Sequence, residues 1–186
     1  MDKERTGEQH KSSVVEETST APLSVGDRVV IDKQGLGRLV ELLKAKGYRV
    51  IGPSLRDGAV VYDELNSIEE LPAGWTDEQE AGRYRLKRRA DGALFGYAVG
   101  PHSWKQFLYP PRTLLWRAER KDGGFVVQEG TEEPARFAFL GVRSCELRAI
   151  AIQDRVFLQG HHTDPQYRAR RTELFTMAAL LADDHD

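Results

Sequence analysis

Cysteine is nearly absent from this sequence. The 186 residues include one cysteine, Cys145, so no disulfide can form within a single copy of the chain. A single thiolate cannot hold a zinc ion or an iron–sulfur cluster, because both need several protein ligands. The composition therefore excludes a disulfide-stapled fold and a cysteine-held metal centre built by this chain alone.

Long apolar runs and a charge excess are also missing. No stretch approaches the roughly 20 apolar residues of a membrane-spanning helix, and residues 1–20 lack the apolar core of a secretory signal. Lys and Arg total 27 against 29 Asp and Glu, which leaves a net charge of −2 without the basic excess of most nucleic-acid binders. These features predict a cytoplasmic globular protein that binds neither membranes nor nucleic acids.

The common sequence fingerprints of catalysis are absent as well. The chain has no glycine-rich dinucleotide or phosphate loop and no paired-histidine zinc motif. His161 and His162 are adjacent, but no third ligand follows at a suitable spacing. The basic run from Arg83 to Arg89 alternates along an expected strand, which favours a solvated or partner-facing surface over phosphate recognition.

Three regions can be distinguished along the chain. Residues 1–24 are polar, mixed in charge and without periodicity, which predicts a disordered tail. Residues 25–182 contain the patterned segments and are expected to form a single α+β domain. Residues 183–186 form an acidic C-terminal end.

The first patterned segments predict a helix followed by two strands. Apolar residues at spacings of three and four over residues 36–43 predict a helix with one buried face, and Gly47 is placed to end it. A strand is expected at residues 48–51, stopped by Gly52-Pro53, and another at residues 59–62.

The middle of the chain is typical of β structure broken by loops. Residues 71–82 are expected to form a polar loop. Residues 84–88 and 94–99 are separated by an Asp-Gly pair and predict a hairpin, and residues 114–118 and 125–128 predict a second hairpin.

The last third of the chain has the strongest pattern. An apolar strand is expected at residues 136–142, a helix at 147–158, and a final helix from about 164 to 181 with Asp164 as its N-cap. The predicted fold class is α+β, with a mixed or antiparallel sheet, hairpins, one N-terminal helix and two C-terminal helices.

The junction between the strand at 136–142 and the helix at 147–158 is the main candidate site. A helix N-terminus offers free N–H groups that favour anions and thiolates. Arg143, Cys145 and Glu146 lie at this point and are candidate cofactor-binding residues, with Ser144 as the expected cap. The alternative, which the apolar segments on both sides favour, is a cysteine that packs partly buried at the turn, with Arg143 and Glu146 paired to neighbours. Partial burial of Cys145 is therefore expected.

Five sets of segments, in order, carry a family resemblance. They are residues 47–53 with 57–64, 75–79 with 82–86, 99–105, 141–146 with 152–157, and 164–167 with Arg170-Arg171. Together they resemble the N-terminal region of the β subunit of cytoplasmic nickel–iron hydrogenases (sulfhydrogenases) and of the related electron-transfer subunit of anaerobic sulfite reductase. The resemblance covers roughly residues 35–175.

The resemblance implies an electron-transfer role within an oxidoreductase complex. The partners that it implies are a catalytic metal subunit together with a flavin-bearing, nicotinamide-oxidising subunit. It places [4Fe–4S] clusters in a cysteine-rich C-terminal part of the family, which this chain lacks, so no cofactor is expected here. The expectation is an N-terminal docking module that is truncated, separately encoded or completed by another chain, and that is not catalytic alone.

Two rival interpretations stay open at this point. The first is an independent thiol- or anion-binding protein that uses the junction at Cys145. The second is a decayed fragment without a present role.

Overall fold

The computed structural model describes residues 22–100, 102–130 and 135–179. The chain divides into two compact units, Met1–Val30 and Ile31–Asp186. In the described part of the first unit, a turn is closed by a 3.1 Å hydrogen bond from the Asp27 N–H to the Ser24 carbonyl. The predicted disordered tail lies, up to residue 21, outside the described residues. The helices and strands of the described residues belong to the second unit.

The first helix, α1, spans Lys33–Ala45 and confirms the periodic pattern. The carboxylate of Asp32 caps its start by accepting a 2.7 Å hydrogen bond from the Gly35 N–H. Gly47 follows the end with a φ of +81°, and the Tyr48 N–H bonds the Leu43 carbonyl at 3.0 Å. The positive φ of Gly47 lets the following N–H group hydrogen-bond a carbonyl of the last helical turn, and it directs the chain into the sheet.

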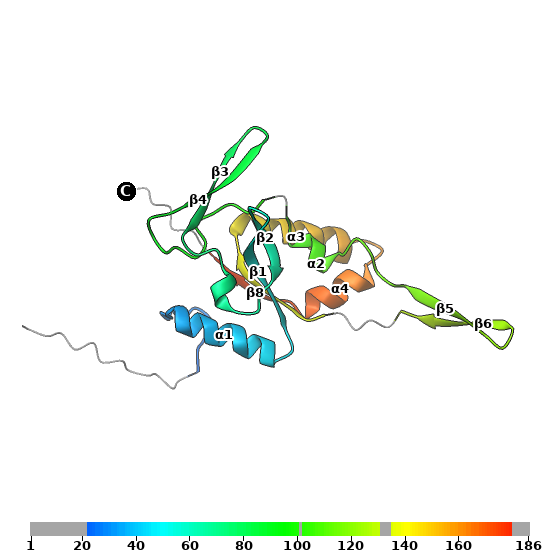
Figure 1. The fold of residues 1–186 in the computed structure, drawn as a ribbon. Helices are drawn as coiled ribbons and strands as arrows, with labels where there is room; N and C mark the ends of the chain where they lie inside the picture. The colour runs from blue at the N-terminus through cyan, green and yellow to red at the C-terminus, as the bar shows by residue number, and fades with distance from the viewer. Residues whose placement is uncertain (1–21, 101, 131–134, 180–186) are drawn as a thin grey trace, which may run out of the picture. The chain divides into compact units, whose positions relative to one another are not determined.

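Four strands form a mixed sheet (Figure 1). They are β1 (Arg49–Arg56), β2 (Ala59–Glu64), β7 (Phe137–Val142) and β8 (Phe175–Ala178). The order is β2-β1-β7-β8. β1 and β2 form an antiparallel hairpin, whereas β7 runs parallel to both of its neighbours.

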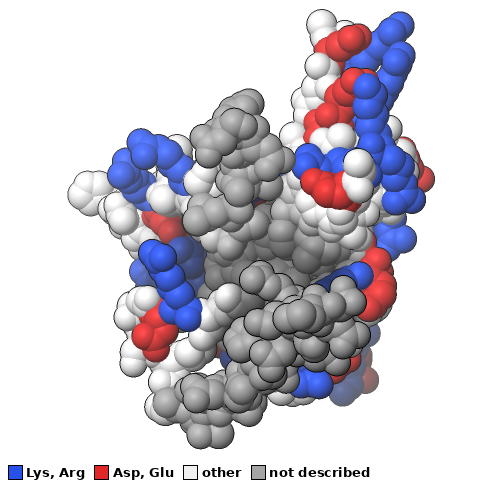
Figure 2. Space-filling view, turned by 90° about the vertical axis from the view of Figure 1, so that its left-hand side faces the viewer, with Lys and Arg blue, Asp and Glu red and all other residues white. Residues whose placement is uncertain are grey.

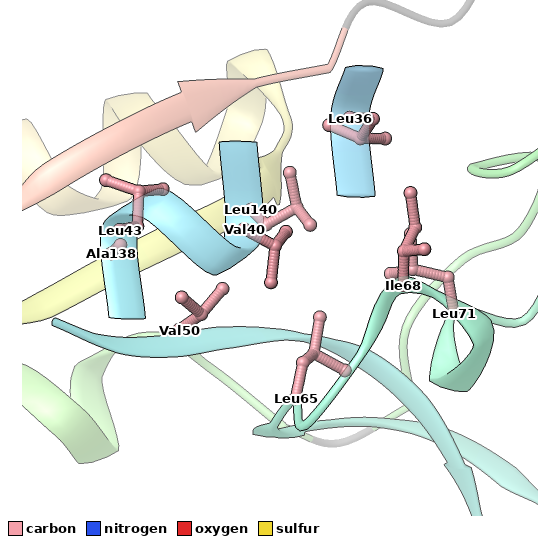
Figure 3. Packing of buried hydrophobic residues seen from close by; sticks show 9 residues of the cluster. All are labelled: Leu36, Val40, Leu43, Val50, Leu65, Ile68, Leu71, Ala138 and Leu140. Carbon is pink, nitrogen blue, oxygen red and sulfur yellow. The ribbon is translucent and has the colours of Figure 1, made fainter. Parts of the chain in front are cut away.

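Alternating side chains of the sheet supply two cores. On one face the apolar side of α1 packs on the sheet (Figure 3). This core consists of Leu36, Val40, Leu43, Val50, Leu65, Ile68, Leu71, Ala138 and Leu140. The other core consists of Ile51, Tyr62, Trp104, Leu108, Phe137, Phe139, Val142, Ile150 and Tyr167. Its residues outside the sheet come from α2 (Lys105–Leu108), α3 (Ser144–Leu158), α4 (Pro165–Thr172) and the segment before α2.

A bulge in β7 changes the alternation just before the candidate site. Leu140 belongs to the α1 core, yet Val142, two residues later, belongs to the opposite core. The β7–β8 register shifts between these two residues, and Gly141 between them has a φ of +83°. The bulge therefore sets the direction from which the chain enters α3.

Two further hairpins lie outside the sheet, and one of them corrects a prediction. β5 (Trp116–Lys121) and β6 (Gly124–Glu129) form the second predicted hairpin. β4 (Arg83–Arg88), however, pairs with β3 (Trp75–Glu80), a segment whose sequence predicts a polar loop. Residues 94–99 form no strand. Cross-strand contacts stabilise the observed pairing, because the guanidinium of Arg88 lies 3.9 Å from the ring centroid of Trp75.

Two boundaries also differ from the predictions. β1 continues through Gly52-Pro53, because beyond Ile51 its described partner is β2 alone and a proline is tolerated at such an edge. The final helix α4 ends at Thr172, and β8 follows instead of further helical turns. β8 pairs with the edge of β7. If residues 175–178 continued the helix, the backbone groups along that edge of β7 would lose these hydrogen bonds.

The predicted α+β class is confirmed, with a mixed sheet, hairpins, one N-terminal helix and two C-terminal helices besides the short α2. Within the part of the chain that the structure describes, no helix is both long enough and apolar enough to cross a bilayer.

Candidate functional site at the strand-to-helix junction

The backbone of the junction is fixed by Glu146. α3 begins at Ser144, three residues before the predicted start, with Arg143 as the N-cap in extended conformation. The carboxylate of Glu146 accepts a 2.9 Å hydrogen bond from the Arg143 N–H. Ser144 is therefore the first helical residue and not the predicted cap. Glu146 takes the capping role from inside the first turn, where its charge also suits the helix dipole.

Glu146 is held in turn by a buried tyrosine of β2. The hydroxyl of Tyr62 donates a hydrogen bond to the Glu146 carboxylate, and the Tyr62 ring stacks on Trp104 with centroids 3.8 Å apart. Tyr62 is 4% exposed. Burial raises the pKa of Tyr62 far above its usual value, and the Glu146 hydrogen bond and charge raise it further. Tyr62 therefore stays a hydrogen-bond donor throughout the physiological range.

Arg143 is held by a second buried tyrosine. Its guanidinium donates to the backbone carbonyl of Tyr97 and lies 5.6 Å from the centroid of the Tyr97 ring. Burial raises the pKa of Tyr97, while the charge of Arg143 opposes this shift. The Tyr97 hydroxyl is buried without a hydrogen-bond partner among the described residues. Arg143 thus ties the segment before α2 to the junction.

A third tyrosine fastens the same segment to β2. The hydroxyl of Tyr84 accepts a 3.3 Å hydrogen bond from the Val60 N–H and donates one of 3.1 Å to the Ala98 carbonyl. Burial raises the pKa of Tyr84 as well. Reasoning from the sequence missed all three tyrosines. Their only signal is their alternation within segments of β character, which does not show what each one faces.

Cys145 is exposed, so the expectation of partial burial is wrong. The buried side of α3 is marked by Ile150, which is 4% exposed. Cys145 lies five residues before Ile150, and five residues of α-helix rotate by one full turn plus about 140°. Cys145 therefore points away from the face that Ile150 buries. The junction therefore divides the three candidates: Arg143 and Glu146 are engaged within the fold, and the Cys145 thiol is open to reagents and partners.

The donor set does not fit an iron–sulfur cluster made by this chain. Such a cluster takes several thiolates, and the chain has one cysteine. Among the described residues, no group of three His, Cys, Asp or Glu side chains is placed to hold a metal ion. His161 and His162 are both exposed.

The basic run from Arg83 to Arg89 is partly paired with carboxylates, across the β3–β4 hairpin and just after it. The ammonium of Lys87 forms an ion pair with Glu78 on β3, and Arg89 binds Asp91 through two hydrogen bonds of 2.7 Å. On the face drawn in Figure 2, Lys and Arg side chains lie next to Asp and Glu side chains. The arrangement agrees with a solvated face of mixed charge.

Comparisons with known proteins give one similarity. No family model matches the chain, and no solved structure matches it. The chain is 27% identical over 136 residues to the sulfhydrogenase 2 subunit beta of Pyrococcus furiosus, a match that covers 73% of this chain. It spans about a third of the length of that relative, 32%. The chain is therefore distantly similar to a hydrogenase β subunit, in agreement with the resemblance of its motifs.

Proposed function

We propose that this chain is a docking module of an electron-transfer subunit in a hydrogenase- or sulfite-reductase-type complex, and that it is not catalytic alone. The observation that carries the proposal is the similarity, across 73% of the chain, to a sulfhydrogenase β subunit. The partners in this proposal are a catalytic metal subunit together with a flavin-bearing, nicotinamide-oxidising subunit. The [4Fe–4S] clusters belong to other parts of that complex, because this chain has one thiol.

The β5–β6 hairpin supports a docking role. The cross-strand pairs place Trp116, Ala118, Phe125 and Val127 on one face of the hairpin, with the charged Arg120 and Glu129 at the two ends of that face. Trp116, Phe125 and Val127 are 61%, 75% and 64% exposed. An isolated two-stranded hairpin is marginally stable in water, and an exposed apolar patch of this kind is typical of an interaction surface.

The opposite face of the same hairpin is polar. It carries Arg117, Glu119, Lys121 and Gln128, together with Val126. The first face is thus the more apolar one, and every residue of both strands is exposed. Packing of that face against another subunit would withdraw its exposed apolar side chains from water, which stabilises the association.

The proposal is tested by anaerobic affinity purification of the tagged chain from its native cells. We expect a complex that contains iron and flavin and that transfers electrons from a nicotinamide to a viologen dye. The double variant Trp116→Ser/Phe125→Ser should lose this complex, whereas Glu119→Ser/Lys121→Ser on the polar face should keep it. Recovery of the unaltered chain alone, or an equal effect of both double variants, would contradict the docking role.

A second candidate function rests on the exposure of Cys145. A thiol-dependent or anion-binding protein would use this side chain, with the free N–H groups of the first turn of α3 beside it. The alkylation rate of the native chain between pH 6 and 9 separates the two candidates. An ordinary exposed thiol slows about tenfold for each pH unit below about 8.5. A rate that stays high down to pH 6 would favour the thiol-dependent function over docking.

A further inference from the structure

A pocket lined by three arginines lies away from the junction. Its volume is about 520 Å³, within the usual range of small-molecule sites of roughly 300–1,000 Å³. The arginines come from three separate parts of the fold: Arg49 opens β1, Arg112 follows α2, and Arg170 lies on α4. The apolar lining consists mainly of Phe107, Pro110 and Phe137.

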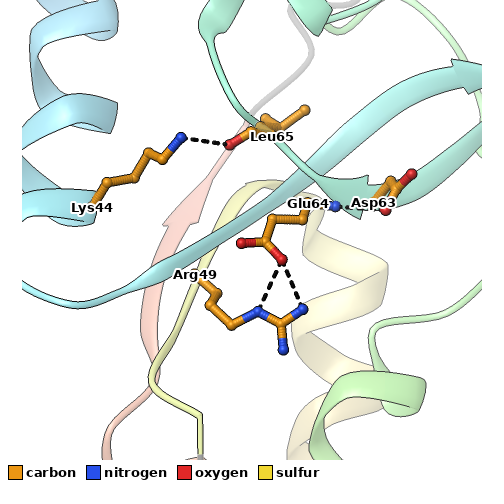
Figure 4. A network of polar contacts seen from close by, with 5 residues as sticks. All are labelled: Lys44, Arg49, Asp63, Glu64 and Leu65. Carbon is orange, nitrogen blue, oxygen red and sulfur yellow. Dashed lines mark hydrogen bonds and ion pairs between the residues drawn. The ribbon is translucent and has the colours of Figure 1, made fainter.

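The positive charge of this pocket is incompletely balanced. Arg49 is paired with Glu64, whose Oε2 accepts from Nε at 2.9 Å and from Nη2 at 2.7 Å (Figure 4). Arg170 bonds neutral acceptors, the backbone carbonyl and side-chain oxygen of Gln166, both at 3.3 Å. Arg112 makes no hydrogen bond or ion pair with the described residues. No carboxylate is among the described residues that line the pocket, so about two positive charges face it uncompensated.

The chemistry of the lining defines the kind of ligand. Guanidinium groups bind phosphate through paired, charge-assisted hydrogen bonds, and several arginines around one cavity are typical of phosphate recognition. Aromatic and proline side chains offer a surface for a flat apolar ring beside the charged group. An acidic side chain of another protein would use the arginines and leave this apolar surface without a role.

From this arrangement we propose that the pocket binds a small organic phosphate that carries a flat ring, of the nucleoside monophosphate class. The phosphate lies between Arg112 and Arg170, and Arg49 adds positive charge from the β1 side. The ring lies against Phe107 and Pro110. The proposal goes beyond the docking role and does not rest on it.

Isothermal titration calorimetry of the full chain with AMP, adenosine and inorganic phosphate tests the proposal. We expect AMP to bind more tightly than inorganic phosphate, and adenosine to show no binding at millimolar concentration. Arg112→Gln and Arg170→Gln should each weaken AMP binding by about tenfold, the usual effect of losing one charged hydrogen bond. Arg155→Gln is the matched control, because Arg155 is an exposed arginine of α3 outside the pocket.

Several results would overturn the proposal. Equal binding of AMP and adenosine would show that the phosphate is not recognised, and an equal loss in Arg155→Gln would show a general charge effect. Displacement of AMP by a lower concentration of a polyglutamate peptide would assign the pocket to an acidic protein segment. The chain also carries Glu132 and Glu133 shortly before Ala135. A tenfold or larger gain in AMP binding in Glu132→Gln/Glu133→Gln would indicate that the pocket binds these carboxylates of the chain itself.

Discussion

Gly141 offers the sharpest test of how the junction is built. It has a φ of +83°, a conformation that costs a residue with a side chain about 1–2 kcal/mol. A Cβ at this position would lie 2.5 Å from Cε1 and 2.9 Å from Cδ1 of Phe95. Forcing an aromatic ring out of its packed position costs about 1–3 kcal/mol. Gly141→Ala should therefore lower the free energy of unfolding by about 2–5 kcal/mol, a large part of the roughly 5–15 kcal/mol of a typical domain.

A matched control separates the two contributions. Gly47 has almost the same φ, +81°, but a Cβ there would meet nothing within 4 Å. Gly47→Ala should cost only the backbone strain, about 1–2 kcal/mol. Phe95→Ala in the Gly141→Ala background should recover the part due to the ring, which a double-mutant cycle isolates as a coupling energy.

The assay is urea unfolding followed by tryptophan fluorescence, with the slope of unfolding free energy against urea checked for each variant. Equal losses in Gly141→Ala and Gly47→Ala would refute the contact with Phe95. A cycle without coupling between Phe95 and Gly141 would do the same. Either result would mean that Gly141 serves only its backbone conformation.

Two further predictions concern the buried tyrosines. Because the fold raises the pKa of Tyr62, the folded state keeps its proton where the unfolded chain loses it; the stability that this provides is complete below about pH 10 and declines as the pH rises further. Tyr62→Phe should therefore show a shallower alkaline decline of unfolding free energy, and an unchanged decline would contradict the burial argument. Asp154 accepts hydrogen bonds from the Tyr167 hydroxyl at 2.8 Å and from Arg171 at 3.0 Å. Asp154→Asn should cost about 1–3 kcal/mol, whereas Asp63→Asn in the exposed pair with Arg56 should cost about 0–1 kcal/mol, as measured by urea unfolding.

The site was only partly predictable from the sequence. Local sequence patterns predict β7, α3 and the junction between them. They also show that the charged residues Arg143 and Glu146 flank Cys145. The partners Tyr62 and Tyr97 lie 84 and 46 positions from Glu146 and Arg143 in the chain. Their approach depends on the sheet order and on the segment before α2, and neither of these leaves a mark in a short window of sequence.

The sequence by itself determined the elements whose signals are local. The α1 periodicity and its Gly47 end, the Asp164 cap of α4, and the β5–β6 hairpin with its Asp-Gly turn all form as their residues predict, because spacing, capping and turn chemistry act within a few residues. The β3–β4 hairpin is local, with Glu80 paired to Arg83 across a two-residue turn, but the polar composition of β3 gave it no strand signal. Only the tertiary structure decided the conversion of residues 175–178 into β8. Its hydrogen bonds are made with the edge of β7, which is available only after the chain has folded.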